Sequence, residues 1–242
     1  AMPFDVCGAM SQGLIGYHIQ QALGQRMQAL GIPGAPVTLV SQVLVDGSDP
    51  AFDHPTKPIG PFYTREQAEA IMAEKGYVFR EDSGRGWRRV VASPLPLQIV
   101  ELAQVKALLA AGFVPIAAGG GGIPVVRRDD GLAGVAAVID KDLAAWRLAE
   151  GLQAGTLLIL TEVEQAFLHY GKPQQKALGE VSAADMRAWL GEGHFAAGSM
   201  GPKVEAALRF VEGGASRVAV ITSLEQSWAG AQGRAGTILR SR

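Results

Sequence analysis

The chain has 242 residues, 48% of them hydrophobic, which is enough to bury the core of one large domain. With 22 basic and 23 acidic residues the formal net charge is −1, so nothing suggests nucleic acid or an anionic membrane as a partner. The single cysteine, Cys7, excludes an internal disulfide and fits a reducing cytoplasm, where we expect the protein.

The first half of the chain predicts a helix, a strand and an insertion. Apolar residues at helical spacing predict a helix over residues 11–29: Leu14, Ile15, Ile19, Leu23, Met27 and Leu30. The β-branched run 37–45 predicts a strand. Prolines punctuate residues 46–96, where the capping box Thr64-x-x-Gln67 opens one helix. We interpret this insertion as a lid subdomain.

Helices and apolar strands alternate in the rest of the chain. We expect helices over 97–111, after Asp140, from Ser182 and Asp185, and around Pro202, which would be a first helical position. We expect strands over 113–118, 156–160, 218–221 and 237–239. The alternation predicts an α/β fold, a three-layer α/β/α sandwich with a mainly parallel sheet. We divide it into an N-terminal section of the α/β core (residues 1–45), a protruding lid subdomain (46–96) and a nucleotide-binding core (97–242).

An uncharged run, residues 107–126, has the length of a membrane span. It contains Pro115, Pro124 and four consecutive glycines, which would leave backbone polar groups unpaired in lipid. We therefore expect a buried strand that runs into a loop, and a protein with no membrane partner.

Two lysines are predicted at helix starts. Lys141 follows the natural N-cap Asp140 and precedes Asp142, and Lys203 follows Pro202. A lysine in a first helical turn opposes the helix dipole unless an anion is present. Each lysine alone is more simply explained as an exposed side chain beside acidic neighbours. Two such placements suggest that both meet one anion, and phosphoryl transfer is the leading hypothesis.

Two further stretches are candidates for anion binding. The glycines Gly119, Gly120, Gly121 and Gly122 follow a buried strand and would let backbone N–H groups approach a ligand, although a flexible turn is the simpler alternative. Pro124 in the sixth position excludes a dinucleotide fingerprint, and no P-loop sequence occurs. Prolines hold Lys57 on the predicted lid, but a loop lysine is usually just solvated.

The remaining chemistry-bearing residues give weaker signals. The four histidines are His18, His54, His169 and His194. They show neither metal-ligand spacing nor a serine partner, so we predict no metal site and no side-chain base. Phe167, Tyr170 and Met200 have the character to border an adenine ring, although ordinary packing is the commoner role.

Taken together, these segments closely resemble the carbamate kinases of the amino-acid kinase superfamily. The matching stretches are 11–17, 49–52, 55–61, 89–91 with 93–94, 118–125, 138–144, 196–206 and 221–225. They span nearly the whole chain in order, and the stretch 56–61 would not be shared by the glutamate, aspartate or nucleoside-monophosphate kinases of the superfamily.

The resemblance implies reversible phosphoryl transfer between carbamoyl phosphate and ADP, giving ATP and carbamate, with Mg²⁺, in a cytoplasmic homodimer of arginine metabolism. It implies that Lys57 and Gly119 to Gly121 bind the substrate. It implies that Lys141 and Lys203 stabilise the transferring phosphoryl group and that Asp142 orients them. Nucleotide contacts fall on four residues, Thr161, Glu162, Tyr170 and Met200. Family members more often have Asp at the position of Glu162.

This sequence also departs from the family's pattern. Family members begin with a strand, a Gly-Gly-Asn-Ala loop and a His-Gly-Asn-Gly-Pro-Gln loop that are absent from this sequence, which matches the family from roughly 70 residues into its length. We therefore expect this polypeptide to be poorly active and prone to association. Two alternatives are a non-catalytic nucleotide-binding module and a related kinase of another small acid.

Overall fold

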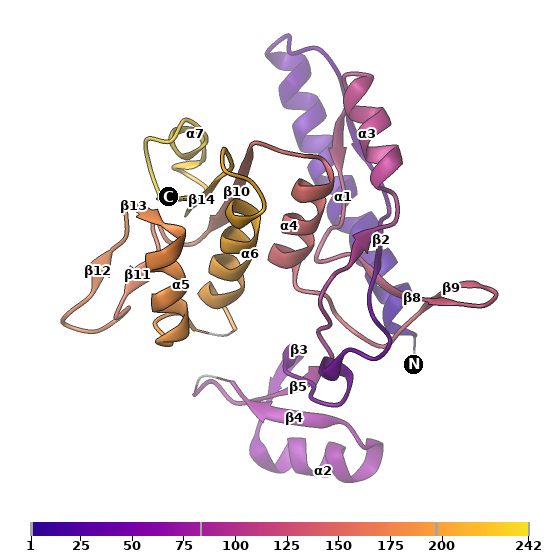
Figure 1. The fold of residues 1–242 in the computed structure, drawn as a ribbon. Helices are drawn as coiled ribbons and strands as arrows, with labels where there is room; N and C mark the ends of the chain where they lie inside the picture. Colours follow the sequence, from indigo (N-terminus) through magenta and orange to yellow (C-terminus); the bar gives the residue numbers. More distant parts are fainter. Residues whose placement is uncertain (1, 83, 197, 242) are drawn as a thin grey trace. The chain divides into compact units, whose positions relative to one another are not determined.

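The chain folds into two compact units, Ala1–Lys141 and Asp142–Arg242, in a computed structural model that describes residues 2–82, 84–196 and 198–241 (Figure 1). Both predicted domain boundaries, after residues 45 and 96, fall within the first unit, and the division into three segments stays a prediction. Among the described residues, no helix has both the length and the apolar character that crossing a membrane requires.

The first unit contains three α-helices, one 3₁₀ helix and three small sheets among its described residues. In chain order its elements are α1 (Phe4–Ala29), β1 (Pro36–Thr38), β2 (Gln42–Leu44), the 3₁₀ helix η1 (Pro50–Phe52), β3 (Lys57–Tyr63), α2 (Arg65–Lys75), β4 (Val78–Glu81), β5 (Trp87–Val91), β6 (Gln98–Ile99), α3 (Leu102–Ala110), β7 (Val114–Ile116), β8 (Ile123–Arg128) and β9 (Gly131–Gly134). Strands β1 and β7 pair in parallel, as do β2 and β8, whereas β6 and β9 add antiparallel edges to the order β6-β2-β8-β9.

Helix α1 is longer than predicted. It begins at Phe4, directly after Pro3, whose carbonyl accepts a hydrogen bond from the Cys7 N–H at 3.0 Å. The apolar spacing that predicted the helix starts only at Leu14, so the first turns carried no periodic signal. Much of that apolar spacing also faces solvent: Leu14 is 62% exposed, whereas Gln12, Gly16 and Met27 are the buried residues of α1.

The strand predicted over 37–45 is two strands, because Ser41 interrupts it. The buried side chain of Gln12 accepts a hydrogen bond from the Ser41 N–H at 2.8 Å and donates one to the Ser41 carbonyl at 3.0 Å. The Ser41 hydroxyl in turn accepts from the Ala118 N–H at 3.1 Å. These hydrogen bonds pair the buried polar groups of Ser41, which belongs to neither strand.

The helix predicted over 97–111 is wrong in its first turn. Residues Gln98–Ile99 form β6 instead, since Ile99 pairs with Val43 of β2 and is buried. The helix proper, α3, begins at Leu102. Here an available sheet edge outweighs helix propensity.

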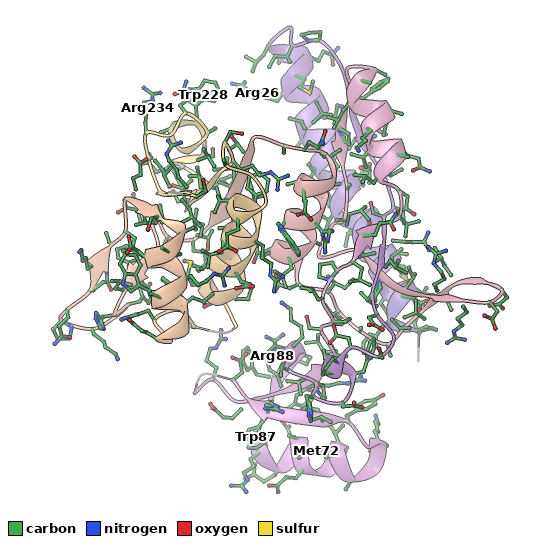
Figure 2. All side chains as sticks on the ribbon, in the orientation of Figure 1. Arg26, Met72, Trp87, Arg88, Trp228 and Arg234 are labelled. Carbon is green, nitrogen blue, oxygen red and sulfur yellow. The ribbon has the colours of Figure 1, made fainter. Side chains whose placement is uncertain are left out.

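The β3-β5-β4 antiparallel sheet and α2 form a small subdomain within the first unit. The predicted capping box is confirmed: the Gln67 N–H donates to the Thr64 hydroxyl, and the Gln67 side chain accepts from the Thr64 N–H. Gly76 ends α2 in the left-handed conformation that glycine adopts without strain. Met72 of α2 and Trp87 of β5 are both seen in this subdomain (Figure 2).

The second unit is an α/β layer structure. Its elements are α4 (Lys141–Gly151, whose first residue closes the first unit), β10 (Thr156–Thr161), β11 (Phe167–Leu168), β12 (Lys176–Ala177), β13 (Glu180–Ser182), α5 (Ala183–Gly191), α6 (Met200–Glu212), β14 (Val218–Ser223), α7 (Ser227–Ala231) and β15 (Thr237–Arg240). The sheet order is β10-β14-β15-β13, with β10–β14 and β13–β15 parallel and β14–β15 antiparallel.

Helix α6 is the most deeply packed helix among those described. Its buried side chains include Val204, Leu208 and Phe210, and it packs on β14 and β15. The helix begins at Met200, so Pro202 is its third residue rather than its first. Proline is tolerated there because first-turn N–H groups have no acceptor within the helix. Ser182 caps α5 as predicted, accepting from the Asp185 N–H.

Candidate active site

Lys57 is the first residue of β3, at the root of the β3-β5-β4 subdomain. Its Nζ donates to Oδ2 of Asp140 at 2.6 Å, and the Asp140 side chain is only 8% exposed against 29% for Lys57. Asp140 directly precedes α4 and so occupies its N-cap position, as predicted. This ion pair lies wholly within the first unit.

Close packing explains three of the four loop glycines. A Cβ on Gly119 would lie 2.6 Å from Gln12 Cγ, one on Gly121 2.2 Å from the Ile139 carbonyl oxygen, and one on Gly122 2.2 Å from Val43 Cγ2. All three have positive φ angles. Gly120 is different, because a Cβ there would meet nothing within 4 Å. Gly120 is thus the loop residue whose surroundings leave room for a ligand.

A cavity of about 260 Å³ borders this loop. It lies between the first turns of α1, the glycine loop and the residues that lead toward α4, and Gly120, Gly122, Gln12 and Val138 are among its lining residues. Its wall is mostly apolar, and Phe4 and Cys7 contribute to it. The glycine loop, which we predicted to bind an anion, therefore lies beside a space large enough for a small ligand.

In the second unit, Lys203 and Asp142 form a buried ion pair. Lys203 Nζ donates to Asp142 Oδ2 at 3.0 Å, and their side chains are 11% and 9% exposed. Asp142 lies in the first turn of α4, where a carboxylate is favoured by the helix dipole, and Lys203 lies in the first turn of α6, where an ammonium is not.

Helices α4 and α6 are joined at a second point. The Arg209 guanidinium of α6 lies 5.1 Å from the ring centroid of Trp146 of α4. The side chains of α4 and α6 thus meet at two points, the Lys203–Asp142 hydrogen bond and this cation–π contact.

Two of the four predicted nucleotide residues, Thr161 and Glu162, lie at the carboxyl end of β10. Thr161 is the last residue of β10 and pairs with Ser223 of β14, Glu162 follows it and is exposed, and Met200 is the first residue of α6. Carboxyl ends of parallel strands are where α/β proteins bind ligands. Tyr170 is 63% exposed, with its ring 5.7 Å from that of Phe167.

The structure contains one predicted pairing, in the second unit, and one that was not predicted, in the first unit. Lys203 meets Asp142, Lys57 meets Asp140, and Lys141 is exposed at the start of α4. Within the described ranges 2–82, 84–196 and 198–241, no group of three or more His, Cys, Asp or Glu side chains is arranged to hold a metal. Sequence reasoning missed Gln12 and the pairing of Asp140, because neither has a local spacing signal.

Known proteins are closely similar to this chain in sequence and in fold. The model of the amino acid kinase family matches residues 5–222. The carbamate kinase of Clostridium perfringens is 52% identical over 235 residues, 97% of this chain and 75% of that protein. That of Pyrococcus furiosus is 51% identical over 98% of this chain and 75% of its own length. The chain belongs to the carbamate kinases of the amino acid kinase family.

Solved carbamate kinases have the same fold. The Giardia lamblia enzyme bound to citric acid matches 99% of this chain and 75% of its own length, with a TM-score of 0.91 and 45% identity. The same enzyme bound to AMP-PNP matches with a TM-score of 0.88. The predicted α/β amino-acid kinase fold, the phosphotransferase class and membership of the carbamate kinases are confirmed. The chain spans about three quarters of the length of the relatives it matches.

Proposed function

We propose that this protein transfers a phosphoryl group reversibly from carbamoyl phosphate to ADP, giving ATP and carbamate. The observation that carries the proposal is the buried Lys203–Asp142 pair in the first turns of α6 and α4. The positive end of the α6 dipole adds to the charge of the ammonium, so this helix start favours an anion in addition to the Asp142 carboxylate. The similarity to carbamate kinases at about 50% identity supports a transferring phosphoryl group as that anion.

The reaction needs no side-chain base. An oxygen of the ADP β-phosphate attacks phosphorus, the bond from phosphorus to the carbamoyl oxygen breaks, and carbamate leaves with the electron pair as an anion. No proton has to move, so catalysis consists of positioning and charge neutralisation. This agrees with histidines that we predict to be outside the site.

Each candidate residue has a proposed role. Lys57 binds carbamoyl phosphate through its ammonium, and Gly119 and Gly120 bind it through backbone N–H groups. The Gly121 N–H donates to the Ala118 carbonyl at 2.7 Å, so Gly121 contributes by shaping the loop around the substrate. Lys141 and Lys203 neutralise the transferring phosphoryl group, and Asp142 positions Lys203 through the 3.0 Å hydrogen bond. Thr161, Glu162, Tyr170 and Met200 bind the nucleotide.

Mg²⁺ is proposed as the accompanying metal. Magnesium is usually held by one or two carboxylates, waters and the substrate's own phosphates, rather than by an all-protein cage. The residue that would hold the ion is Asp142, a buried carboxylate in the first turn of α4, together with the phosphates of the substrate. When bound, the ion would neutralise phosphate charge.

The homodimer, the cytoplasmic location and the role in arginine metabolism are proposals as well. The exposed apolar stripe of α1, formed by Val6, Met10, Leu14 and Tyr17, supports self-association. The single cysteine supports a reducing compartment.

The test is ATP formation from ADP, Mg²⁺ and carbamoyl phosphate, comparing the wild type with Lys203→Met. Removing a buried cation that acts on the phosphoryl group should lower kcat by about 100-fold or more. Lys106→Met, which changes an exposed lysine of α3, is the matched control and should leave kcat unchanged. Circular dichroism of each variant separates lost chemistry from lost folding.

Other results would overturn the proposal. A wild type that shows a nucleotide-induced thermal shift but no turnover would be a binding module. Turnover with acetyl phosphate but not with carbamoyl phosphate would indicate a related kinase of another small acid. Full activity of Lys203→Met would remove the pair from the mechanism.

A further inference from the structure

The contact between Lys57 and Asp140 joins residues that are 83 positions apart in the chain. A hydrogen bond of 2.6 Å between an ammonium and a carboxylate is short and charge-assisted. The carboxylate is the more buried partner, so Asp140 is the fixed end of the pair and Lys57 is the end that reaches toward it.

The backbone behind Lys57 is fastened to the same segment that carries Asp140. Lys57 pairs with Val91 of β5, and the next residue, Ala92, forms a parallel bridge with Ala137. The Val138 N–H donates to the Ala92 carbonyl at 3.0 Å. The root of the subdomain and the start of α4 are thus joined through both backbone and side chain.

A lysine held in this way differs from a solvated one. Its four-carbon stem has many rotamers, and ordering it at the moment of substrate binding would cost conformational entropy. Asp140 orders the stem before substrate arrives. It uses one of the three N–H donors of the ammonium, which leaves the others to reach an anion.

We propose that Asp140 is a positioning residue for Lys57, holding its ammonium where the remaining donors meet the anionic end of carbamoyl phosphate. The inference rests on the proposed function and deepens it by assigning a substrate-positioning role to Asp140. Asp140 acts through Lys57, so it affects the binding of carbamoyl phosphate and leaves the binding of ADP unchanged.

Two substitutions separate this role from capping of α4. Serine and asparagine are both good N-caps, so Asp140→Ser and Asp140→Asn keep the cap. Serine is too short to reach Lys57, and asparagine still accepts a hydrogen bond but carries no charge. We expect the KM for carbamoyl phosphate to rise about tenfold in Asp140→Ser and about threefold in Asp140→Asn, the range for loss or weakening of a charge-assisted bond.

A double-mutant cycle tests whether Asp140 acts through Lys57. Lys57→Met should raise the KM for carbamoyl phosphate, and adding Asp140→Ser to it should change that KM no further. If the two increases in KM multiply in the double variant, Asp140 acts independently of Lys57, and the inference is overturned. A rise in the KM for ADP of the same size would do so as well.

A readout that needs no turnover keeps this test separate from the proposed function. The rate at which an acetylating reagent modifies Lys57 is followed by peptide mass spectrometry, with the exposed Lys75 of α2 as the internal standard. We expect Asp140→Ser to accelerate labelling of Lys57 several-fold and to leave Lys75 unchanged. Unchanged labelling of Lys57 would overturn the inference. Accelerated labelling in a protein without any turnover would refute the proposed function and support the positioning contact.

Discussion

Gly121 is the loop glycine whose added Cβ would collide first with a backbone atom, and its replacement makes the clearest test of the loop's architecture. Its φ of 138° is one that side chains rarely adopt, and an added Cβ would collide with the Ile139 carbonyl oxygen. We expect Gly121→Ala to lower the free energy of unfolding by about 3 kcal/mol. Urea denaturation followed by circular dichroism measures this change.

Gly120→Ala is the matched control, because it adds the same methyl group one residue away into open space. Its free energy of unfolding should stay within about 0.5 kcal/mol of the wild type. An increase in the KM for carbamoyl phosphate in this folded variant would support a substrate contact at Gly120. Equal destabilisation by both substitutions would contradict the packing described for the loop.

The Lys203–Asp142 pair also makes a stability prediction. Replacing one member of a buried ion pair usually costs about 3 to 5 kcal/mol, because the partner charge loses its counterion. We expect Lys203→Met and Asp142→Asn each to approach this range. The double variant should be more stable than the sum of the two losses predicts. Simple additivity in urea denaturation at pH 7 would show that the two side chains do not interact.

For individual residues, the sequence predicted the lysines better than their partners. Lys141 and Lys203 stand out because a cation at a helix start opposes the dipole, and this is visible in a few consecutive letters. Asp140 was recognised only as an N-cap, since its lysine lies far away in the chain. Gln12 gave no signal, because a buried amide is identified by the backbone it binds, and that backbone, at Ser41, is distant in sequence.

Among the elements, α2 has a start that the sequence predicted from both partners of its capping box. Thr64 and Gln67 exchange hydrogen bonds across the first turn. We expect Thr64→Ala to destabilise the folded protein by about 1 kcal/mol. Thr64→Ser keeps the hydroxyl and should stay close to the wild type. Thermal unfolding measures both, and equal stability of the alanine and serine variants would contradict a capping role.

The same turn makes a pH prediction. The backbone N–H of Glu66 first, and the Thr64 hydroxyl second, lower the pKa of the Glu66 carboxyl below its ordinary value. A carboxyl with a depressed folded-state pKa stabilises the helix start above its unfolded pKa, and this is lost as the pH falls through the folded pKa. We expect Thr64→Ala to raise the pKa of Glu66, measured by NMR titration. An unchanged pKa would contradict the contact.

Where elements differed from prediction, long-range pairing decided the outcome. The run 37–45 has the composition of one strand, but Gln12 holds Ser41 out of the ladder and divides it. Gln98 and Ile99 have a helical context but complete an edge beside β2. The strands at β10, β14 and β15 were predicted well, because continuous burial produces continuous apolar runs.

In the molecule as a whole, the apolar stripe of α1 is exposed, although its spacing predicted a face buried in the core. Val6, Met10, Leu14 and Tyr17 recur at intervals of one helical turn and are between 41% and 62% exposed. The same periodicity marks a core-facing helix and an interface-facing helix, so sequence spacing alone does not distinguish them. The buried residues Gln12 and Gly16 lie away from this stripe, as do Ile15 and Ile19, which are 40% and 44% exposed.

This stripe leads to a prediction about assembly. We expect the wild type to sediment as a dimer or larger species at micromolar concentration, because covering the stripe removes apolar area from water. Met10→Glu combined with Leu14→Glu should shift the protein toward the 25.4 kDa monomer. Gln25→Glu combined with Gln28→Glu adds the same two charges to exposed positions of α1 without removing apolar side chains, and should leave the assembly intact. If both double variants sediment alike, net charge rather than the stripe governs association, and the surface would have to be sought elsewhere on the molecule.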